Sequence, residues 1–241
     1  MNLIIDIGNS KVKLAIFKEN NLLIKITCEP KDLVENIKKL QKEYFLANCI
    51  ISSVSDLDTS KVLNLENFTK IILLDHKSKV PFVNKYKSPN TLGVDRIALA
   101  SAAVTKYPNQ HVLAIDAGTC VTYDFIDSDK KYLGGAISPG IAMRYRSLHQ
   151  YTANLPLLEP NEFKLIGKDT NSSIHSGVLN GLIKEIDGII DQYKTNYTNL
   201  TVVLTGGGTI FLAKKLKSTI FANPNFLLEG LNSILIHNLD E

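Results

Sequence analysis

The chain of 241 residues contains few cysteines, few arginines and no long apolar run. Its three cysteines, Cys28, Cys49 and Cys120, lie far apart and form no CxxC or Cys/His cluster. This spacing argues against a disulfide framework and a structural zinc site, and it favours a reducing compartment. No apolar run approaches the roughly 20 residues that span a bilayer, and the first residues lack the features of a signal peptide. We therefore expect a cytoplasmic protein with no membrane partner.

Arginine is scarce, since only Arg96, Arg144 and Arg146 contribute to the 27 basic residues. These three positions are the candidates for recognising an anion through two parallel hydrogen bonds, which is the property that separates arginine from lysine. Acidic residues number 24, which gives a net charge of +3, and the lysines are scattered along the chain. The sequence therefore predicts no nucleic-acid partner.

The strongest positive signal is an internal repeat. The segment LIIDIGNS at residues 3–10 returns as LAIDAGTC at residues 113–120, and each copy predicts a strand, a tight turn and a second strand. One copy alone could be an ordinary hairpin. Because Asp6 and Asp116 would repel each other without a cation, the pair favours a site for a metal and a polyphosphate. The repeat predicts two similar domains, 1–110 and 111–241, with a nucleotide in the cleft between them.

The apolar periodicity predicts an α/β fold. Each half begins with a three-stranded antiparallel meander followed by alternating helices and strands, which is typical of a ribonuclease-H-like domain. In the first half we expect strands at 2–7, 11–17, 21–26, 49–51 and 71–74, and helices at 30–43 and 93–105. In the second half we expect strands at 112–115, 121–126, 132–137 and 202–205, and helices at 139–150, 170–193, from the 206–208 turn to 217, and 226–239.

The segment Gly93-Val94-Asp95-Arg96 opens the second predicted helix. Asp95 can be an N-cap or first-turn acid that the helix dipole favours. It can also be a general base that accepts the proton of a substrate hydroxyl, with Arg96 holding a second polar group of the substrate. The residues by themselves leave both interpretations open.

Glycines mark three further places. The segment GGAISPG at 134–140 indicates either close approach to a ligand or a bulge and a corner. The three glycines at 206–208 indicate either a bare surface for a nucleotide base or ribose, or an ordinary loop. Gly177 and Gly181 lie four residues apart in a predicted helix, so another helix should pack on that face, from this chain or from a second copy. Thr170 is the predicted N-cap of that helix.

The ordered motifs DIGNSKVK, YKSPNTLGVDR, DAGTCVTYD, GGAISPG, GKDTNSSIHSG and LTGGG resemble the type III pantothenate kinases over nearly the whole chain. That family belongs to the superfamily of acetate and sugar kinases, Hsp70 and actin. The resemblance implies two actin-like ATPase domains and ATP-dependent phosphorylation of pantothenate to 4′-phosphopantothenate, the first step of coenzyme A biosynthesis. It also implies a homodimer that requires Mg²⁺ and a monovalent cation, K⁺ or NH₄⁺.

The resemblance further implies roles for single residues. Asp95 would be the general base, Asp6 would serve Mg²⁺ and Asp116 would hold K⁺ or NH₄⁺. The residues implied for ATP are Asp6, Ile7, Gly8, Asn9, Ser10, Lys11, Val12, Lys13 and Thr119. The residues implied for pantothenate are Tyr86, Gly93, Val94, Asp95, Arg96 and Thr170, the last reaching the substrate across the dimer interface.

Two other functions fit the same motifs. A related small-molecule kinase could phosphorylate a sugar or a carboxylate, and a carboxylate acceptor would make a general base superfluous. A non-catalytic nucleotide-binding regulatory protein could share the fold. The absence of a basic patch and of a zinc-binding set speaks against a repressor that binds DNA, but not against regulation through protein partners.

Overall fold

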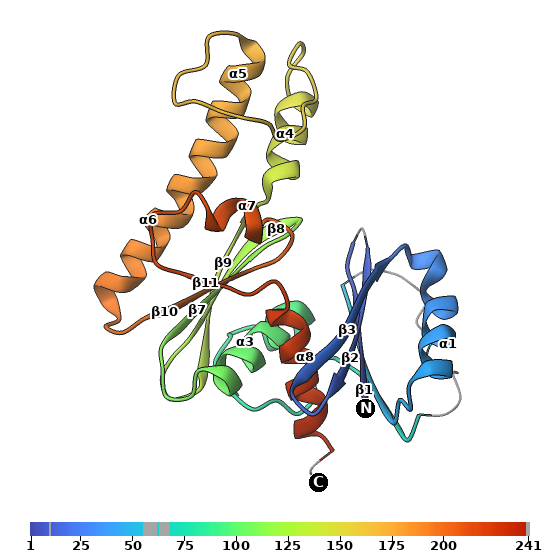
Figure 1. Ribbon diagram of the computed structural model, residues 1–241. Helices are drawn as coiled ribbons and strands as arrows, with labels where there is room; N and C mark the ends of the chain where they lie inside the picture. Colours follow the sequence, from blue (N-terminus) through green and yellow to red (C-terminus); the bar gives the residue numbers. More distant parts are fainter. Residues whose placement is uncertain (10, 55–61, 63–67, 240–241) are drawn as a thin grey trace. The chain divides into compact units, whose positions relative to one another are not determined.

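The computed structural model describes residues 1–9, 11–54, 62 and 68–239, and these residues form two compact units (Figure 1). The first unit comprises residues 1–108, 130–132 and 225–239, and the second comprises 109–129 and 133–224. The sequence predicted domains over 1–110 and 111–241. In the structure the chain first changes unit at residues 108–109, but residues 130–132 and the last helix return to the first unit.

The first unit is built on a five-stranded sheet in the order β3-β2-β1-β4-β5. Strands β1, β2 and β3 are antiparallel, while β4 and β5 run parallel to β1. This arrangement confirms the predicted antiparallel meander, and it shows that the two strands after it are parallel to β1. The strands are β1 (Asn2–Ile7), β2 (Val12–Lys18), β3 (Asn21–Cys28), β4 (Asn48–Ser53) and β5 (Lys70–Leu73).

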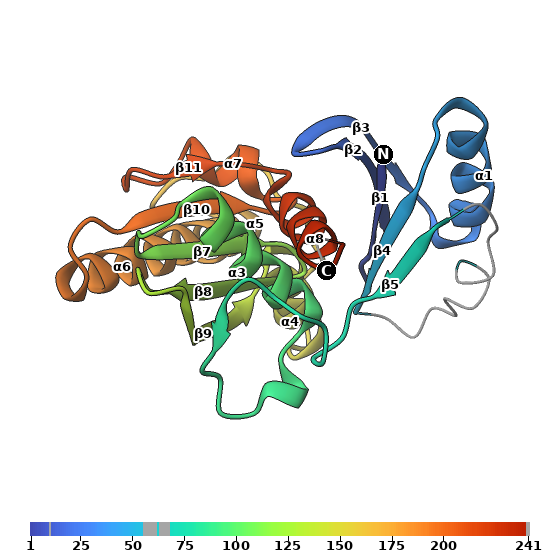
Figure 2. The same ribbon diagram turned by 90° about the horizontal axis from the view of Figure 1, so that it is seen from below.

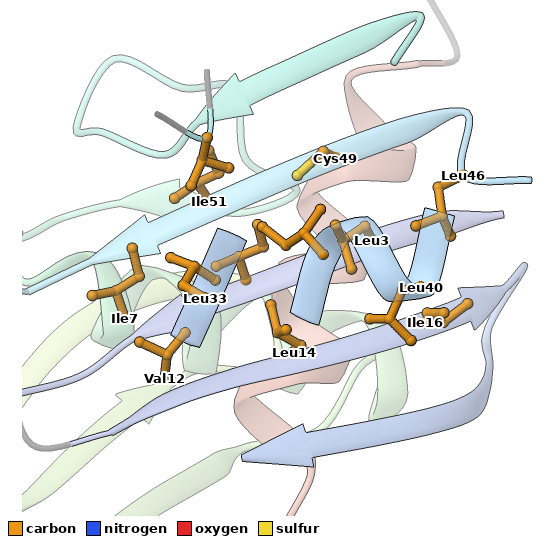
Figure 3. Close-up of a cluster of buried hydrophobic side chains, with 13 residues drawn as sticks. Leu3, Ile7, Val12, Leu14, Ile16, Leu33, Leu40, Leu46, Cys49 and Ile51 are labelled. Atoms are coloured by element: carbon orange, nitrogen blue, oxygen red, sulfur yellow. The ribbon is translucent and has the colours of Figure 1, made fainter. Parts of the chain in front are cut away.

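One face of this sheet packs against α1 (Leu33–Glu43), which follows a short 3₁₀ turn at Pro30–Asp32 (Figure 3). Because side chains alternate along a strand, Leu3 and Ile7 of β1 point to α1, where they meet Leu33 and Leu40. The apolar residues of α1 recur at helical spacing, so the helix buries one stripe and leaves its lysines in solvent.

The opposite face of the same sheet is covered by α8 (Phe226–His237), which also packs on α3 (Val94–Lys106) (Figure 2). Asn232 of α8 accepts a hydrogen bond from Asn2 of β1, with 3.1 Å between Nδ2 and Oδ1. Eight of the twelve residues of α8 are buried, most of them apolar, so the helix needs cover on more than one side. Its burial against β1, β4 and α3 is the physical reason why the end of the chain belongs to the first unit.

The second unit contains most of a six-stranded sheet in the order β11-β10-β7-β8-β9-β6. The hairpin of β7 and β8 repeats that of β1 and β2, and β10 pairs in parallel with β7. The strands are β7 (Val112–Ala117), β8 (Cys120–Ile126), β9 (Lys131–Pro139), β10 (Thr201–Thr205), β11 (Phe221–Ala222) and, from the first unit, β6 (Val83–Asn84). The two-residue strands β6 and β11 were not predicted, since so few residues show no periodicity.

The predicted helix 170–193 is an α-helix interrupted by one wider turn. It comprises α5 (Thr170–His175), a π-helical turn at Ser176–Asn180 and α6 (Gly181–Asn196), which form one long rod in Figure 1. Its apolar face covers β7, β8 and β10 through residues such as Leu182 and Ile186. Among the described residues, no atom lies within 4 Å of a Cβ built on Gly177 or Gly181.

The remaining helices of the second unit are α4 (Ile141–Gln150) and α7 (Thr209–Ala213). The sequence predicted that α7 would continue to residue 217, which is wrong. The buried carboxylate of Asp187 accepts hydrogen bonds from the backbone N–H groups of Lys217 and Ser218 at 3.1 to 3.2 Å. These bonds hold the chain after Ala213 in a non-helical path.

Gly230 tests the packing of α8. A Cβ at this position would lie 1.9 Å from the carbonyl oxygen of Ala98 in α3, so Gly230→Ala forces the two helices apart. We expect a loss of about 3 kcal/mol in the free energy of unfolding, measured by urea denaturation. The matched control is Gly188→Ala in α6, where a Cβ meets no atom of the described chain, and it should stabilise by about 0.5 to 1 kcal/mol. Equal effects would show that α8 and α3 are not in such close contact.

Candidate active site

Asp6 lies at the carboxyl end of β1 and is 5% exposed. Its cross-strand neighbour Lys13 donates a hydrogen bond from Nζ to Oδ2 at 3.0 Å. On the other side, Ser52 of β4 stands opposite Asp6 and is fully buried, and its Oγ has no hydrogen-bond partner in the described part of the chain. A buried carboxylate needs a compensating cation, and here an ammonium supplies the charge. Its oxygens are the hard ligands that Mg²⁺ prefers, so the site fits this metal.

The turn after β1 is closed by a hydrogen bond from the N–H of Gly8 to the carbonyl of Lys11, at 3.1 Å. Ile7 and Val12 on either side are buried in the core below the turn. They can therefore offer only backbone groups to a ligand. The side chain of Lys11 pairs with Glu29 on the surface.

The other predicted phosphate-loop residues differ in their placement. Asn9 is exposed, while Ser10 lies outside the described residues. Lys13, for which the sequence predicts a contact with ATP, contacts the carboxylate of Asp6.

Asp95 occupies the first turn of α3 and is not its N-cap, which is Gly93. Its Oδ1 accepts the N–H of Arg96 at 2.8 Å, and a Cβ on Gly93 would lie 2.3 Å from the same oxygen. Burial raises the pKa of Asp95, the N–H of Arg96 opposes this, and the negative charge of Asp6 raises the pKa further. Asp95 and Asp6 are thus electrostatically coupled within the first unit, and Gly93 leaves space for the carboxylate.

Arg96 follows Asp95 and is 5% exposed. Its guanidinium lies over two aromatic rings, 5.7 Å from the centroid of Tyr86 and 6.0 Å from that of Tyr132. The structure therefore brings the predicted substrate residues Tyr86 and Gly93 to Arg96 together in one unit. It adds Tyr132, which sequence reasoning missed because an apolar aromatic residue at the start of a strand looks like ordinary core.

In the second unit, the turn after β7 repeats the turn after β1, and glycines from the segments 134–140 and 206–208 form hydrogen bonds with it. Gly118 donates to the carbonyl of Cys120 at 2.9 Å, Gly140 to that of Thr119 at 3.1 Å, and Gly208 to that of Ala117 at 2.9 Å. A Cβ on Gly140 would lie 2.4 Å from the carbonyl oxygens of both Gly118 and Thr119.

The same kind of contact explains Gly135, whose Cβ would lie 1.6 Å from the carbonyl oxygen of Tyr123. The glycines of GGAISPG thus permit close approach of the backbone to this protein's own chain.

Asp116 is half-buried at the end of β7, beside Gly206. Gly206 has φ of +88°, and a Cβ there would lie 2.2 Å from Oδ1 of Asp116. The same Cβ would lie 2.7 Å from the carbonyl oxygen of Ala117, so this oxygen and the carboxylate are two hard oxygen donors that suit an alkali cation. Next to it, a cavity of about 260 Å³ is lined by Gly118, Gly207 and Gly208, together with apolar side chains such as Val121. The bare glycine surface predicted at 206–208 therefore borders a cavity.

Thr170 is exposed at the first position of α5, and the N-cap is Asp169, which forms a capping box with Ser172. The prediction of Thr170 as the N-cap was wrong by one residue. Thr170 lines a second cavity of about 730 Å³, together with Arg144. Arg144 is bound from Nη2 to Glu185 at 2.5 Å. Within the second unit, Thr170 and the Asp116 turn thus border different cavities.

No group of three or more histidines, cysteines and acidic residues in the described ranges is gathered as a protein metal centre would require. A metal at Asp6 would thus share its other coordination positions with ligands such as phosphate oxygens and water, which is the usual manner of Mg²⁺. No helix in these ranges is long and apolar enough to cross a bilayer.

Comparison with known proteins identifies the family of this chain. The profile of the type III pantothenate kinases matches residues 2–192. A type III pantothenate kinase of Christiangramia forsetii is 50% identical over 99% of this chain and 99% of its own length. The chain belongs to the type III pantothenate kinase family. As a member of this family it is a kinase, with ATP as the phosphoryl donor and a divalent metal ion as cofactor.

Solved structures show the fold. A protein of Campylobacter jejuni described as a Baf family transcriptional activator is 22% identical, with a TM-score of 0.66 over 99% of this chain and 100% of that one. A ROK family glucokinase of Streptomyces griseus, solved with glucose and AMPPNP, is 11% identical, with a TM-score of 0.53 over 98% of each chain. The predicted pair of ribonuclease-H-like, actin-like ATPase domains is thereby confirmed as the fold class of this family member.

Gly206 tests the contact with Asp116. We expect Gly206→Ala to lower the free energy of unfolding by at least about 2 kcal/mol, because a left-handed φ and a displaced carboxylate act together. Gly207→Ala is the neighbouring control, since a Cβ there meets no atom of the described chain, and it should change stability by less than about 0.5 kcal/mol. Chemical denaturation of both variants provides the measurement. Similar values for the two would refute the tight contact at Asp116.

Proposed function

We propose that the protein transfers the γ-phosphoryl group of ATP to the terminal hydroxyl of pantothenate and forms 4′-phosphopantothenate, the first step of coenzyme A biosynthesis. Membership of the type III pantothenate kinase family supports the reaction. The structural observation that carries the proposal is the juxtaposition of Asp95 and Arg96 at the start of α3, coupled electrostatically to Asp6. This grouping offers a proton acceptor, an anion-binding side chain and a metal ligand within one unit.

Asp95 acts as the general base. Its carboxylate orients the hydroxyl of pantothenate and takes its proton as the oxygen bonds to phosphorus. Phosphoryl transfer passes through a loose transition state, in which the hydroxyl proton leaves late, so a base of moderate strength is sufficient. The raised pKa of Asp95, which burial causes first, makes the carboxylate a better proton acceptor than an exposed one.

Arg96 binds the carboxylate of pantothenate. Pantothenate carries its reacting hydroxyl and its carboxylate at opposite ends, so a base and a cation in one pocket fix both ends. The guanidinium lies against the rings of both Tyr86 and Tyr132 and presents a rigid set of donors. Gly93 and Val94 complete the pocket beside Asp95.

The turn at Asp6 is the proposed site for the phosphates of ATP, through backbone groups of residues 7–12, and the side chain of Thr119 in the second unit is a further proposed contact. Asp6 would hold Mg²⁺, which would neutralise charge on the phosphates. Lys13 supplies a positive charge beside Asp6. When Asp6 binds the metal, Lys13 is free to contact a phosphate oxygen, which reconciles its observed and expected partners. That both turns bind one nucleotide stays a prediction.

Asp116 holds the monovalent cation, K⁺ or NH₄⁺. Asp116 is half-buried, the carbonyl oxygen of Ala117 lies on the same side of Gly206 as its carboxylate, and Gly206 leaves space for that carboxylate. Replacing K⁺ by Na⁺ in the assay described next examines this role, since the two ions carry the same charge and differ in size.

The decisive experiment measures ADP release from ATP with Mg²⁺ and K⁺, in the presence and absence of pantothenate. We expect release that depends on pantothenate, and Asp95→Asn should lower kcat at least about 100-fold, the scale of a general base. ATP binding, followed by calorimetry, should change little in this variant.

The same assay separates the alternatives. A nucleotide-binding regulator would release no ADP with pantothenate, and a kinase for a carboxylate acceptor would stay active after Asp95→Asn. A parallel loss of ATP binding and turnover would assign Asp95 a structural role.

We further infer that the protein is a homodimer in which Thr170 reaches the pantothenate site of the partner subunit. Large hydrophobic side chains are exposed in the segments that follow α4 and precede α5, among them Tyr151 at 81%, Leu165 at 80% and Ile166 at 74%. The surface over Gly177 is open, so a second copy can pack closely there. These features support an interface on the α4 and α5 side of the second unit.

A shared site can be tested by mixing two inactive variants. Thr170→Tyr should block the site of the partner subunit, and Asp95→Asn should inactivate its own. A dimer with one copy of each variant then has one site with both native residues, so random mixing should restore about one quarter of the native activity.

The control mixes Asp95→Asn with the double variant and should stay inactive. If the first mixture is no more active than its two components, Thr170 does not act across subunits.

A further inference from the structure

We propose that Tyr132 is a positioning residue for substrate recognition, which holds the Arg96 guanidinium in the orientation that binds the carboxylate of the acceptor substrate. The inference rests on the proposed function, because it names how the anionic end of that substrate is selected. Tyr132 lies on β9, and none of the motifs that carry the family resemblance contains it.

The position of Tyr132 is fixed by backbone pairing. The first residues of β9 pair in parallel with β6, and Asn84 stands opposite Tyr132. The carbonyl of Tyr132 accepts the N–H of Lys85 at 2.9 Å, and the N–H of Val83 binds the carbonyl of Lys130 at the same distance. These bonds explain why residues 130–132 belong to the first unit, although β9 continues into the second.

The ring of Tyr132 is fully buried in an aromatic cluster. Its centroid lies 6.0 Å from that of Phe82 and 6.1 Å from that of Tyr86. The rings are tilted by 59° and 45°, the arrangement that the charge distribution of aromatic rings favours. The ring therefore has one place and one orientation.

Arg96 lies against this fixed ring. Its guanidinium carbon is 6.0 Å from the centroid of Tyr132 and 5.7 Å from that of Tyr86. Both distances are within the range in which the negative face of a ring attracts a cation, and burial strengthens the attraction. Two rings on one planar group restrict its rotation, so its donors point in a constant direction.

The backbone of Arg96 meanwhile holds the proposed base. Its N–H donates to Oδ1 of Asp95 at 2.8 Å. Arg96 thus contacts the proposed proton acceptor through its backbone and supplies the anion-binding group through its side chain. The two aromatic rings fix only the side chain. Removing the ring of Tyr132 should therefore disturb recognition of the carboxylate more than the chemical step.

The test compares pantothenate with panthenol, in which a primary alcohol replaces the carboxylate. We expect Tyr132→Leu to raise the KM of pantothenate about tenfold, the scale of a buried cation–π contact, and to leave kcat and the KM of ATP within about threefold. The inhibition constant of panthenol against pantothenate should change less than about twofold, since panthenol presents no charge to Arg96. Tyr132→Phe keeps the ring and should behave like the native protein.

Two further variants separate positioning from general damage. Phe82→Leu removes a ring of the same cluster and should affect pantothenate and panthenol alike. In an Arg96→Lys background, whose ammonium lacks the planar group that the rings hold, adding Tyr132→Leu should raise the KM of pantothenate less than twofold. Equal losses for both ligands, or a full tenfold effect in the Arg96→Lys background, would overturn the inference.

The outcomes also distinguish this inference from the proposed function. If the native protein releases no ADP in response to pantothenate, the proposed function fails whatever Tyr132 does. If the native protein is active and Tyr132→Leu leaves the KM of pantothenate unchanged, only the role of Tyr132 fails.

Discussion

Placing a carboxylate inside a protein costs several kcal/mol unless a cation or hydrogen-bond donors accompany it, and this constraint organises the first unit. Asp6 ends a fully buried strand, so the neighbouring strand supplies Lys13 on the same face. Asp95 approaches the same region, and the backbone of Arg96 compensates part of its charge. The cation of Arg96 is in turn held by Tyr86 and Tyr132. Asp6 is therefore compensated by a cation, Asp95 by a backbone N–H group, and Arg96 by two aromatic rings.

In the second unit, close packing of the backbone rather than charge compensation fixes the corresponding turn. Around Asp116 the backbone segments lie so close that a single methyl group at Gly140 or Gly206 would collide with them. Such contacts leave few alternative conformations, because interiors are packed at the density of organic crystals. The two copies of the repeated motif thus share a hairpin and a terminal carboxylate, but different forces stabilise them.

Much of the fold was predictable from the sequence, because the strands and helices near the sites have clear periodicity. The repeat at residues 3–10 and 113–120 indicated two related sheets, and the sheet order confirms both meanders. The sequence could not place the last helix with the first unit, because periodicity shows that α8 has an apolar face but not which surface it covers. The end of α7 was missed because it depends on Asp187, a residue that is distant in sequence.

The site was predictable to the extent that its residues lie in short motifs. Gly93 to Arg96 and Tyr86 are close in the chain, and the structure brings them together. Tyr132 contributes through a two-residue strand pairing that no local pattern announces. The ion pair of Lys13 with Asp6 was not predicted, because it depends on the pairing register of two strands.

The passage of the chain between the units has a consequence for dissecting the protein. Residues 1–108 contain the complete sheet of the first unit, but the helix that covers one face of it is encoded more than a hundred residues later. A fragment that stops near residue 110 would expose Ile4 and other apolar side chains to water, and it would tend to aggregate. The sequence can therefore be divided into halves on paper, whereas the polypeptide has to be synthesised to its last helix before its first half is finished.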